Sequence, residues 1–540
     1  MSSDLPQFAS IAGELAPNLW GRTDFQKYDA GWAKAANWIV DYRGGLFTRN
    51  GLEFGDIIEW SEGQDVKFVE FQYSPDTANT YLCIFTDDKV RFAQDNAYVL
   101  ESVKTVTALA NDSGDRVEFT SASHGYSDGD WVKLAGFTTN SSLNTRTAEV
   151  ANATTNTFTL IDPITGNDIE IASVSTEAGE VYRIYTITSP YGEEDLARLQ
   201  AVQVRDYVRL THPDYPIKNL IRSGATSWSI ANEDLTVSIA PPTSLSGSSS
   251  IDEDRCYVYQ VTSVDAEGNE SIPEILILLN ATDFSADGER NTIEFTHATD
   301  AVSYNIYRSR GHLSSVGQNI IADATVGYLG NCIGNTFVDP GITPDFTKQP
   351  TIEYDPFANG AIRSVTVSAG GSGYFYDDTI TWPAGGSGAD GFVVTRGENG
   401  GSLQDIKAIK VLKGGKNYTG TTITVGGGTG ATLTAVLSAA TGNNPRCSVL
   451  FQQRMLYGGT DNNPLRLFGS RVGLLNNFSY TEIGAESDSY EFDLDAPKVA
   501  PIRHLRTVTG GLLVFNEIGV WLICLADRDW ETKIIQQSST

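Results

Sequence analysis

Two stretches near the C-terminal end of the chain decide its fold class: PRCSVLFQQRMLYGGTDNNPLRLFGSRVGLLNNFSYTEI, residues 445–483, and IRHLRTVTGGLLVFNEIGVWLICL, residues 502–525. Both consist of short apolar runs separated by Gly and Asn turns, which is typical of successive antiparallel strands. Their even spacing predicts propeller-like blades over residues 441–540. Because no closing strand or polar cap is visible from Gln536 to Thr540, we expect either a last blade completed elsewhere or a truncated chain.

An internal repeat precedes these blades, in residues 346–440. RSVTVSAGGSGYFYDDTITWPAGGSGADGFVV aligns with KAIKVLKGGKNYTGTTITVGGGTGATLTAVL, and each copy reads strand, Gly-Gly-x-x-Tyr, strand, Gly-rich turn, strand. The matched positions are Gly370, Gly371 and Tyr374 in the first copy and Gly414, Gly415 and Tyr418 in the second. The glycines supply positive φ for tight turns, and the tyrosines cover the neighbouring strand. A phosphate-binding loop is the alternative, but no Lys-Ser/Thr and no helix follows either loop, so we interpret both as hairpin turns.

Residues 246–345 form a further β module behind a linker of small residues, PPTSLSGSSSIDED. CYVYQVTSV alternates apolar and polar residues, DAEGNES makes a turn, and the strands ILILL, TIEFT and SYNIYRS follow. This order resembles a fibronectin type III sandwich, a module that usually serves as a spacer or as an adhesive surface domain.

Three segments remain toward the N-terminus. Residues 1–102 are predicted to be a β platform with strands over 68–73 and 81–85 and one helix over Asp24–Val40, where Phe25, Tyr28, Trp32, Ala36 and Ile39 make an apolar stripe. Residues 103–187, rich in Thr, Ser, Asn and Val, are predicted to be an inserted small β domain. Residues 188–245 return to the platform with a helix from about 193 to 202, a strand around 206–210 and a His-Pro turn.

Two groups of residues could form a metal site or a catalytic pair, but for both we prefer a structural role. His124 lies near Asp128 and Asp130, but Gly, Ser and Asp here are first of all turn formers, and a lone His is weak evidence for a metal. Asp206 and His212 would suit a catalytic pair, yet no nucleophile elbow accompanies them. The sequence therefore predicts no catalytic residue, no cofactor-binding residue and no metal site.

The net charge and the cysteine content indicate which functions and which cellular compartment suit the chain. The formal net charge of −29 makes the average surface repel phosphate, which disfavours ordinary DNA binding and would suit a channel through which DNA slides; solubility is the simpler explanation. Five scattered cysteines without a CxxC are expected to be buried free thiols in a reducing cytoplasm: Cys83, Cys256, Cys332, Cys447 and Cys524. The N-terminus does not look like a signal peptide, and no apolar run is long enough to span a membrane.

Three stretches together resemble the nozzle proteins of short-tailed bacteriophages, also called tail tubular protein B. The first, FASIAGELAPNLWGRTDFQKYDAGWAKAANWIVDYRGGLFTRNGLEF, matches through Gly13, Glu14, Leu15, Pro17, Arg22, Asp24, Tyr28, Asn37, Gly44, Gly45 and Arg49. The second, VQVRDYVRLTHPDYPIKNLIR, matches through Gln203, Asp206, His212, Pro213, Leu220 and Arg222. The third, FQQRMLYGGTDNNPLRLFGSRVGLLNNFS, matches through Gln453, Arg454, Gly459, Thr460, Pro464, Ser470, Gly473 and Phe478.

The resemblance implies a structural role in the virion and no enzymatic activity. It implies a homohexameric ring that stacks below the tail adaptor protein, extends and gates the channel, and lets genomic DNA pass without specific binding. Tail fibres are a further partner that it suggests. Assembly would take place in the host bacterial cytoplasm, before the protein becomes part of the virion.

Two rival functions stay open. A receptor-binding or adhesin tail protein would use the sandwich and exposed aromatic residues. A tail-borne polysaccharide depolymerase would need a pair of carboxylates about 5–9.5 Å apart, but the acidic residues are scattered in turns and no long run of β-helix repeats is present. The fold class expected in every case is mainly β and multidomain, with antiparallel sheets.

Overall fold

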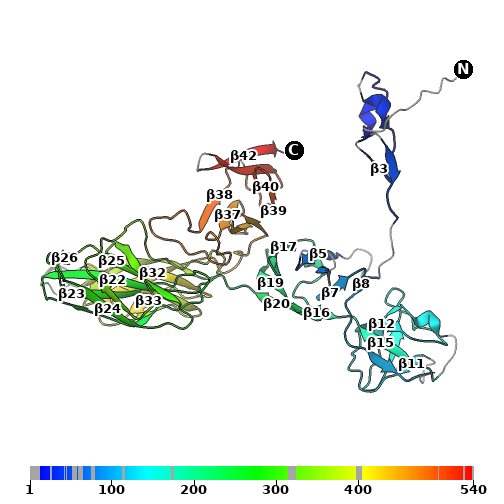
Figure 1. The fold of residues 1–540 in the computed structure, drawn as a ribbon, viewed down its shortest axis with the longest axis horizontal. Coiled ribbons are helices and arrows are strands. Elements are labelled where there is room, and N and C mark those ends of the chain that lie inside the picture. Colours follow the sequence, from blue (N-terminus) through cyan, green and yellow to red (C-terminus); the bar gives the residue numbers. More distant parts are fainter. Residues whose placement is uncertain are drawn as a thin grey trace. The chain divides into compact units, whose positions relative to one another are not determined.

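The computed structural model describes residues 12–24, 27–41, 43, 45–51, 57–58, 65–74, 79–111, 116–171, 176–313, 324–396, 404–496, 498–526 and 529–537. Phe25 and Gly44, used above, lie outside these ranges. Over the described part the fold is mainly β and multidomain with antiparallel sheets, as predicted (Figure 1). The chain divides into two compact units, residues 1–58 and 59–540, which are described separately.

The first unit is built from very short elements: β1 Gly13–Glu14, η1 Pro17–Leu19, η2 Tyr28–Ala30, β2 Gly31–Trp32, β3 Trp38–Val40 and β4 Leu46–Thr48. β1 pairs in parallel with β2, and β3 forms a hairpin with β4. Leu15 is the one fully buried hydrophobic residue among those described in this unit, whereas Trp20, Trp38 and Phe47 are 54%, 48% and 51% exposed. The unit therefore has very little core of its own.

The helix predicted over Asp24–Val40 is wrong. The structure has a single 3-10 turn at Tyr28–Ala30, then strand β2, and later β3. Asn37 adopts a φ of 67°, which an α-helix does not allow. The chain at Gly31 also packs against Leu15 so closely that a Cβ there would lie 2.5 Å from Leu15 Cγ. Pairing with β1 therefore overrides the helical spacing of the apolar residues.

Four sheets of up-and-down strands, here called blades 1 to 4, make the framework of the second unit. Blade 1 contains β5 Lys67–Gln72, β6 Thr80–Thr86, β7 Lys89–Gln94, β8 Ala97–Tyr98 and β16 Thr186–Thr188. Blade 2 contains β17 Gln200–Val204, β18 Tyr207–His212, β19 Tyr215–Gly224 and β20 Ser227–Asn232. Blade 3 contains β35 Cys447–Phe451, β36 Arg454–Gly458, β37 Arg466–Gly469 and β38 Tyr490–Asp493. Blade 4 contains β39 Ile502–Val508, β40 Gly511–Asn516, β41 Gly519–Ala526 and β42 Asp529–Gln537.

The blades pack on one another in chain order, each through an apolar core. Phe71 of blade 1 meets Trp228 of blade 2, and Ile217 of blade 2 shares a core with Phe468 of blade 3. Blades 3 and 4 share a core that includes Trp521. β42 gives blade 4 a fourth strand from this chain, so the expectation that the last blade is completed elsewhere is wrong.

Helix α1, Glu193–Leu196, connects blade 1 to blade 2. It begins at the predicted residue but is much shorter than predicted, because Gln200–Val204 pairs with β18 as a strand. None of the helices in the described part has the length and apolar character that a membrane span requires.

An inserted module interrupts blade 1 between β8 and β16. It contains β9 Lys104–Val106, β10 Ala108–Asn111, β11 Val117–Thr120, β12 Trp131–Ala135, η4 Ser141–Leu143, β13 Thr147–Ala151, β14 Thr157–Ile161 and β15 Gly179–Arg183. The strand order is β10-β11-β14-β13-β12-β15-β9, around a core that includes Phe119, Phe137 and Phe158.

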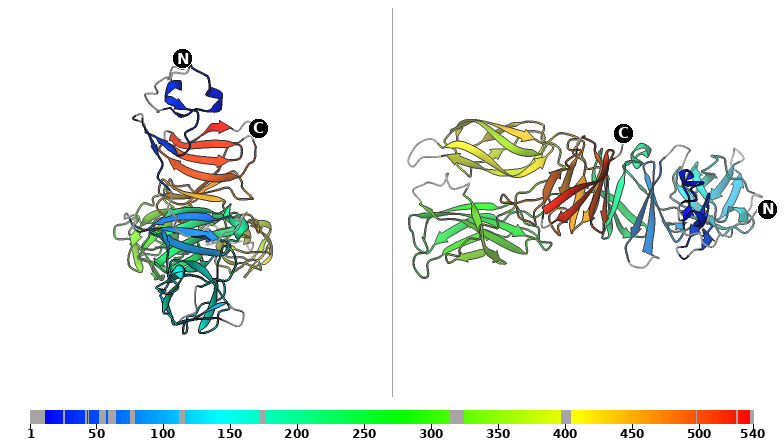
Figure 2. Two further views of the ribbon diagram at one scale, coloured as in Figure 1. Left: turned by 90° about the vertical axis from the view of Figure 1, so that its right-hand side faces the viewer. Right: turned by 90° about the horizontal axis from the view of Figure 1, so that it is seen from above.

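Two more modules lie between blades 2 and 3, and Figure 2 shows them side by side. The sandwich has one sheet of β21 Thr243–Ser249, β24 Asn291–Thr296 and β28 Thr336–Asp339. Its other sheet has β22 Arg255–Val264, β23 Glu274–Ala281, β25 Ser303–Ser309, β26 His312–Leu313 and β27 Val326–Cys332. Its first strand, β21, pairs with β24, and the next two strands, β22 and β23, pair with each other in the second sheet.

The Gly-rich module contains β29 Ile362–Ser372, β30 Ile380–Thr381, β31 Ser387–Arg396, β32 Asp405–Lys416, β33 Thr422–Val425 and β34 Thr429–Leu437. Its two sequence copies exchange strands: β29 pairs with β34, β30 with β33, and β31 with β32. β31 and β32 also pack on the sandwich through a shared core that includes Phe392 and Tyr307.

Candidate functional site

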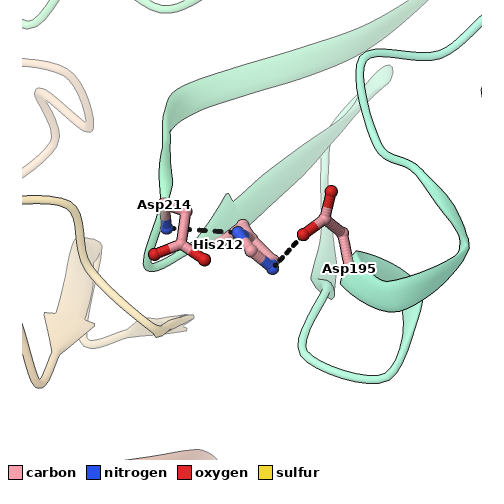
Figure 3. A group of neighbouring side chains, drawn as sticks. All are labelled: Asp195, His212 and Asp214. Atoms are coloured by element: carbon pink, nitrogen blue, oxygen red, sulfur yellow. Dashed lines mark hydrogen bonds and ion pairs between the residues drawn. The ribbon is translucent and has the colours of Figure 1, made fainter.

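A buried polar cluster lies where helix α1 meets the β18–β19 turn (Figure 3). His212 has no exposed surface, and its Nε2 lies 3.6 Å from Oδ1 of Asp195. The backbone N–H of Asp214 donates to His212 Nδ1 at 3.2 Å. Arg198 contacts both carboxylates, at 3.2 Å from Asp195 and 2.7 Å from Asp214. The hydroxyl of Tyr215 donates to Asp195 at 2.7 Å.

The hydrogen bonds fix the protonation of the imidazole. Because Nδ1 of His212 accepts a backbone N–H, the proton of the neutral ring lies on Nε2 and points toward Asp195. Burial and the charge of Arg198 lower the pKa of His212, so the ring is neutral near pH 7. Asp195 holds the pKa of Tyr215 at about 12, which keeps that hydroxyl a donor.

This chemistry favours a structural role. Asp195, His212 and Asp214 bring three ligand atoms within 4.8 Å, as a metal site would. However, a protonated Nε2 is no metal ligand, and Arg198 already occupies both carboxylates. No hydrogen bond joins His212 to a Ser, Thr or Cys side chain among the described residues. The pairing of His212 with Asp206 that the sequence suggested is not made, because Asp206 lies exposed in the β17–β18 turn.

His124 is buried and also makes structural contacts. Its Nδ1 accepts the N–H of Tyr126 at 2.9 Å, and its ring packs on Phe158. Asp128 accepts the N–H of Ala153, and Asp130 accepts that of Ser127. The hydrogen bonds to His124 and Asp130 are local and close turns, whereas the one to Asp128 ties this loop to the loop that contains Ala153.

Glu253, Asp283 and Glu289 form a second acidic group, at one end of the sandwich. The N–H of Asp283 donates to Glu253 at 2.6 Å, and the hydroxyl of Thr282 donates to Glu289 at 2.6 Å. Hydrogen bonds from Ser285 lower the pKa of Asp283. Each of the three carboxylates thus takes part in holding the loop.

Three of the positions that carry the family resemblance, Gln203, Arg222 and Gly459, lie where one blade contacts the next. The Gln203 side chain exchanges hydrogen bonds with the backbone of Gln72 in blade 1, at 3.0 and 2.5 Å. Arg222 lies over the ring of Tyr73, with its Cζ 4.0 Å from the ring centroid. Gly459, with a φ of 64°, approaches the backbone of Ile502 so closely that a Cβ would lie 2.8 Å from its oxygen. These residues therefore hold blades together.

A cavity of 1320 Å³ lies beside blade 3, and it was not predicted from the sequence. It is bounded by β38, by the loop between β37 and β38, by the β35–β36 turn and by the segment around Tyr354. Its aromatic side chains come from four separate stretches of sequence, so only the tertiary structure brings them together.

The structure confirms part of the prediction that the five cysteines are buried free thiols. Cys83, Cys256 and Cys447 are buried free thiols, and Cys332 is half-buried. Burial raises the pKa of Cys83, Cys256 and Cys447, as expected for inert core residues. The side chain of Cys524 lies outside the described part.

Comparison with protein-family models and with curated proteins gives no match to this chain.

Proposed function

We propose that this chain is a structural subunit of a short-tailed phage tail, a nozzle protein that forms a ring around the channel for the genome. The observation that carries the proposal is the stack of four blades, whose two end faces differ. Head-to-tail contact between unlike faces is the geometry that closes copies of one chain into a ring.

The two end faces both carry apolar side chains. On the outer face of blade 1, Phe68 is 50% exposed and Leu82 is 39% exposed. On the outer face of blade 4, Leu513 lies opposite Leu522, and both are half-buried. Burying apolar surface between neighbouring copies would stabilise the ring.

The first unit supports the same assignment. Its exposed Trp20, Trp38 and Phe47 make it a poor candidate for an independent domain, because Leu15 alone is buried among the hydrophobic residues that the structure describes in it, which offsets little of the folding entropy. In the proposed assembly this unit docks on a neighbouring copy or on the tail adaptor protein.

The acidic surface supports the proposed passage of DNA. A net charge of −29 on each subunit would keep genomic DNA from adhering to the wall. Gating of the tip and contacts with tail fibres belong to the same proposal, which requires no covalent chemistry and places the protein in the virion.

Mass measurement by light scattering and electron microscopy of the purified full chain, alone and with the adaptor ring of the same phage, tests the proposal. We expect a closed sixfold ring with a central channel. Phe68→Asp should prevent the ring from forming while leaving the melting temperature of the subunit within a few degrees of the wild type.

Ile164→Asp is the matched control, because Ile164 is 73% exposed but belongs to the inserted module. It should leave the ring intact. A chain that stays monomeric in the presence of its adaptor, or that forms a peripheral trimer, would contradict the proposed role.

A further inference from the structure

The cavity beside blade 3 has the composition of a ligand site. At 1320 Å³ it is larger than the roughly 300–1,000 Å³ of ordinary small-molecule pockets, so it suits an extended ligand. Six aromatic residues line it: Tyr354, Phe468, Phe478, Tyr480, Tyr490 and Phe492.

Two pairs of these aromatic rings are in contact. Tyr490 and Phe492, both on β38, lie with centroids 6.0 Å apart and planes inclined by 25°, and the Arg454 guanidinium lies 5.0 Å from the centroid of Tyr490. Tyr354 and Tyr480 meet edge to face at 5.9 Å, and Tyr480, which is 39% exposed, is the most exposed aromatic residue of the lining. Exposed aromatic rings stack against the C–H faces of sugar rings, which are apolar on their faces and polar at their edges.

The polar groups of the cavity are mainly acceptors. Glu486 and Glu491 are exposed carboxylates, and Gln452 adds an exposed amide. Arg454 is the one cation of the lining, and its guanidinium already donates to the backbone oxygens of Ser470, Glu486 and Asp488. An anionic ligand would therefore meet like charge, whereas hydroxyl groups would find acceptors.

The β35–β36 turn is an independent sign that the cavity edge is specialised. Gln452 and Gln453 both adopt positive φ, 50° and 60°, in a two-residue hairpin turn where Asn-Gly is the favoured sequence. Residues other than Gly rarely adopt this left-handed conformation. The turn thereby places the Gln452 side chain on the cavity wall.

We propose that this cavity binds a neutral oligosaccharide of several units, stacked on the exposed ring of Tyr480 with its hydroxyl groups donating to Glu486 and Glu491. The site lies within one chain, so the inference does not depend on ring formation. It would give the protein a contact with a bacterial surface glycan in addition to any role in the channel.

Saturation-transfer NMR and calorimetry on the full chain test the site, with maltohexaose, cellohexaose, laminarihexaose and chitohexaose as neutral probes and hexagalacturonate as the anionic probe. We expect at least one neutral probe to bind in the millimolar range or tighter, and hexagalacturonate not to bind. Tyr480→Ala and Glu486→Gln should each weaken binding by about tenfold, a loss of one stacking or charged hydrogen-bond contact.

Phe375→Ala removes a similarly exposed aromatic side chain in the Gly-rich module and should leave the affinity unchanged. Thermal melting of each variant shows whether it is folded, and Glu486→Gln keeps the backbone oxygen that Arg454 uses. The proposal is overturned if no neutral probe binds, if the cavity variants bind as tightly as the wild type, or if Tyr480→Ala alters the oligomeric state instead, since the cavity would then receive a second copy of the chain.

Discussion

Arg454 is a buried cation that donates its hydrogen bonds to backbone carbonyls and lies over the ring of Tyr490. It donates to Ser470, Asp488 and Glu486 at 2.5–2.6 Å and ties the β37–β38 loop to β36. Arg454→Met would leave these carbonyls without a donor, so we predict that it lowers the free energy of unfolding by about 2–4 kcal/mol, measured by urea titration.

Arg466→Met is the comparison within the same blade. Arg466 forms ion pairs with Asp493 and Glu491, both of which are substantially exposed. Its loss should cost less than about 1 kcal/mol. Equal effects of the two substitutions would contradict the role assigned to Arg454.

His212 makes the stability of the chain depend on pH. The folded state holds its pKa below the ordinary value of 6.5, so the unfolded chain binds the proton first as the pH falls. The unfolding free energy should therefore decrease as the pH drops through about 6.5 toward the lower folded-state pKa.

His212→Gln should flatten this dependence, because the amide keeps an acceptor for the Asp214 N–H but does not titrate. The pKa values of His312 and His504 are also lowered by burial and act in the same direction, so part of the slope remains. Denaturant titrations at about pH 7.5 and about pH 5.5 measure the difference. A slope unchanged by His212→Gln would show that the cluster does not respond to pH.

At the scale of elements, the Gly-rich module is held by matching contacts across its two copies. The Tyr374 hydroxyl accepts the N–H of Ala431, and the Tyr418 hydroxyl accepts that of Ala389. A Cβ at Gly428 would lie 2.6 Å from Tyr374, and one at Gly386 would lie 2.5 Å from Tyr418. Each tyrosine thus needs a glycine from the other copy.

We predict that Gly386→Ala and Gly428→Ala each destabilise the module by about 1–3 kcal/mol, and by similar amounts, because the two sites are equivalent. Gly426→Ala is the control, since its nearest neighbour would be 3.8 Å away. Differential scanning calorimetry of the three variants checks this. A much larger effect at one site than at the other would show that the copies are not equivalent in energy.

Elements with a two-residue period or a repeat were predictable from the sequence, and elements set by distant pairing were not. Alternation locates β5, β6 and β22 closely, and the aligned glycines reveal the two copies of the repeat, though not the pairing of strands between the copies. The expected helix over residues 24–40 fails because Glu14 and Leu15, earlier in the chain, hydrogen-bond to that stretch.

The polar cluster around His212 could likewise be predicted only in part from the sequence. His212 was singled out from the sequence, but its true neighbour Asp195 lies in helix α1, on the far side of strand β17 in the chain. The cavity beside blade 3 combines Tyr354 with residues more than a hundred positions later. Local spacing carries no information about such contacts.

At the scale of the whole molecule, the charge makes a direct prediction about DNA. With a net charge of −29, the purified chain should not retard double-stranded DNA in a gel at physiological ionic strength. A basic DNA-binding domain of similar mass is the positive control. Retardation that weakens as salt is added would reveal a phosphate-binding patch and would argue against a channel wall that releases DNA.

Because strands of the two Gly-rich copies pair with each other, the two copies must fold together. In the first copy, β29, β30 and β31 all pair with strands of the second. A lone copy in a separate polypeptide would therefore have to find a twin in solution, and its folding would depend on protein concentration. Tandem duplication within one gene removes that dependence by tethering the twins at high effective concentration. The covalent link between the two copies thus makes the folding of the module independent of protein concentration.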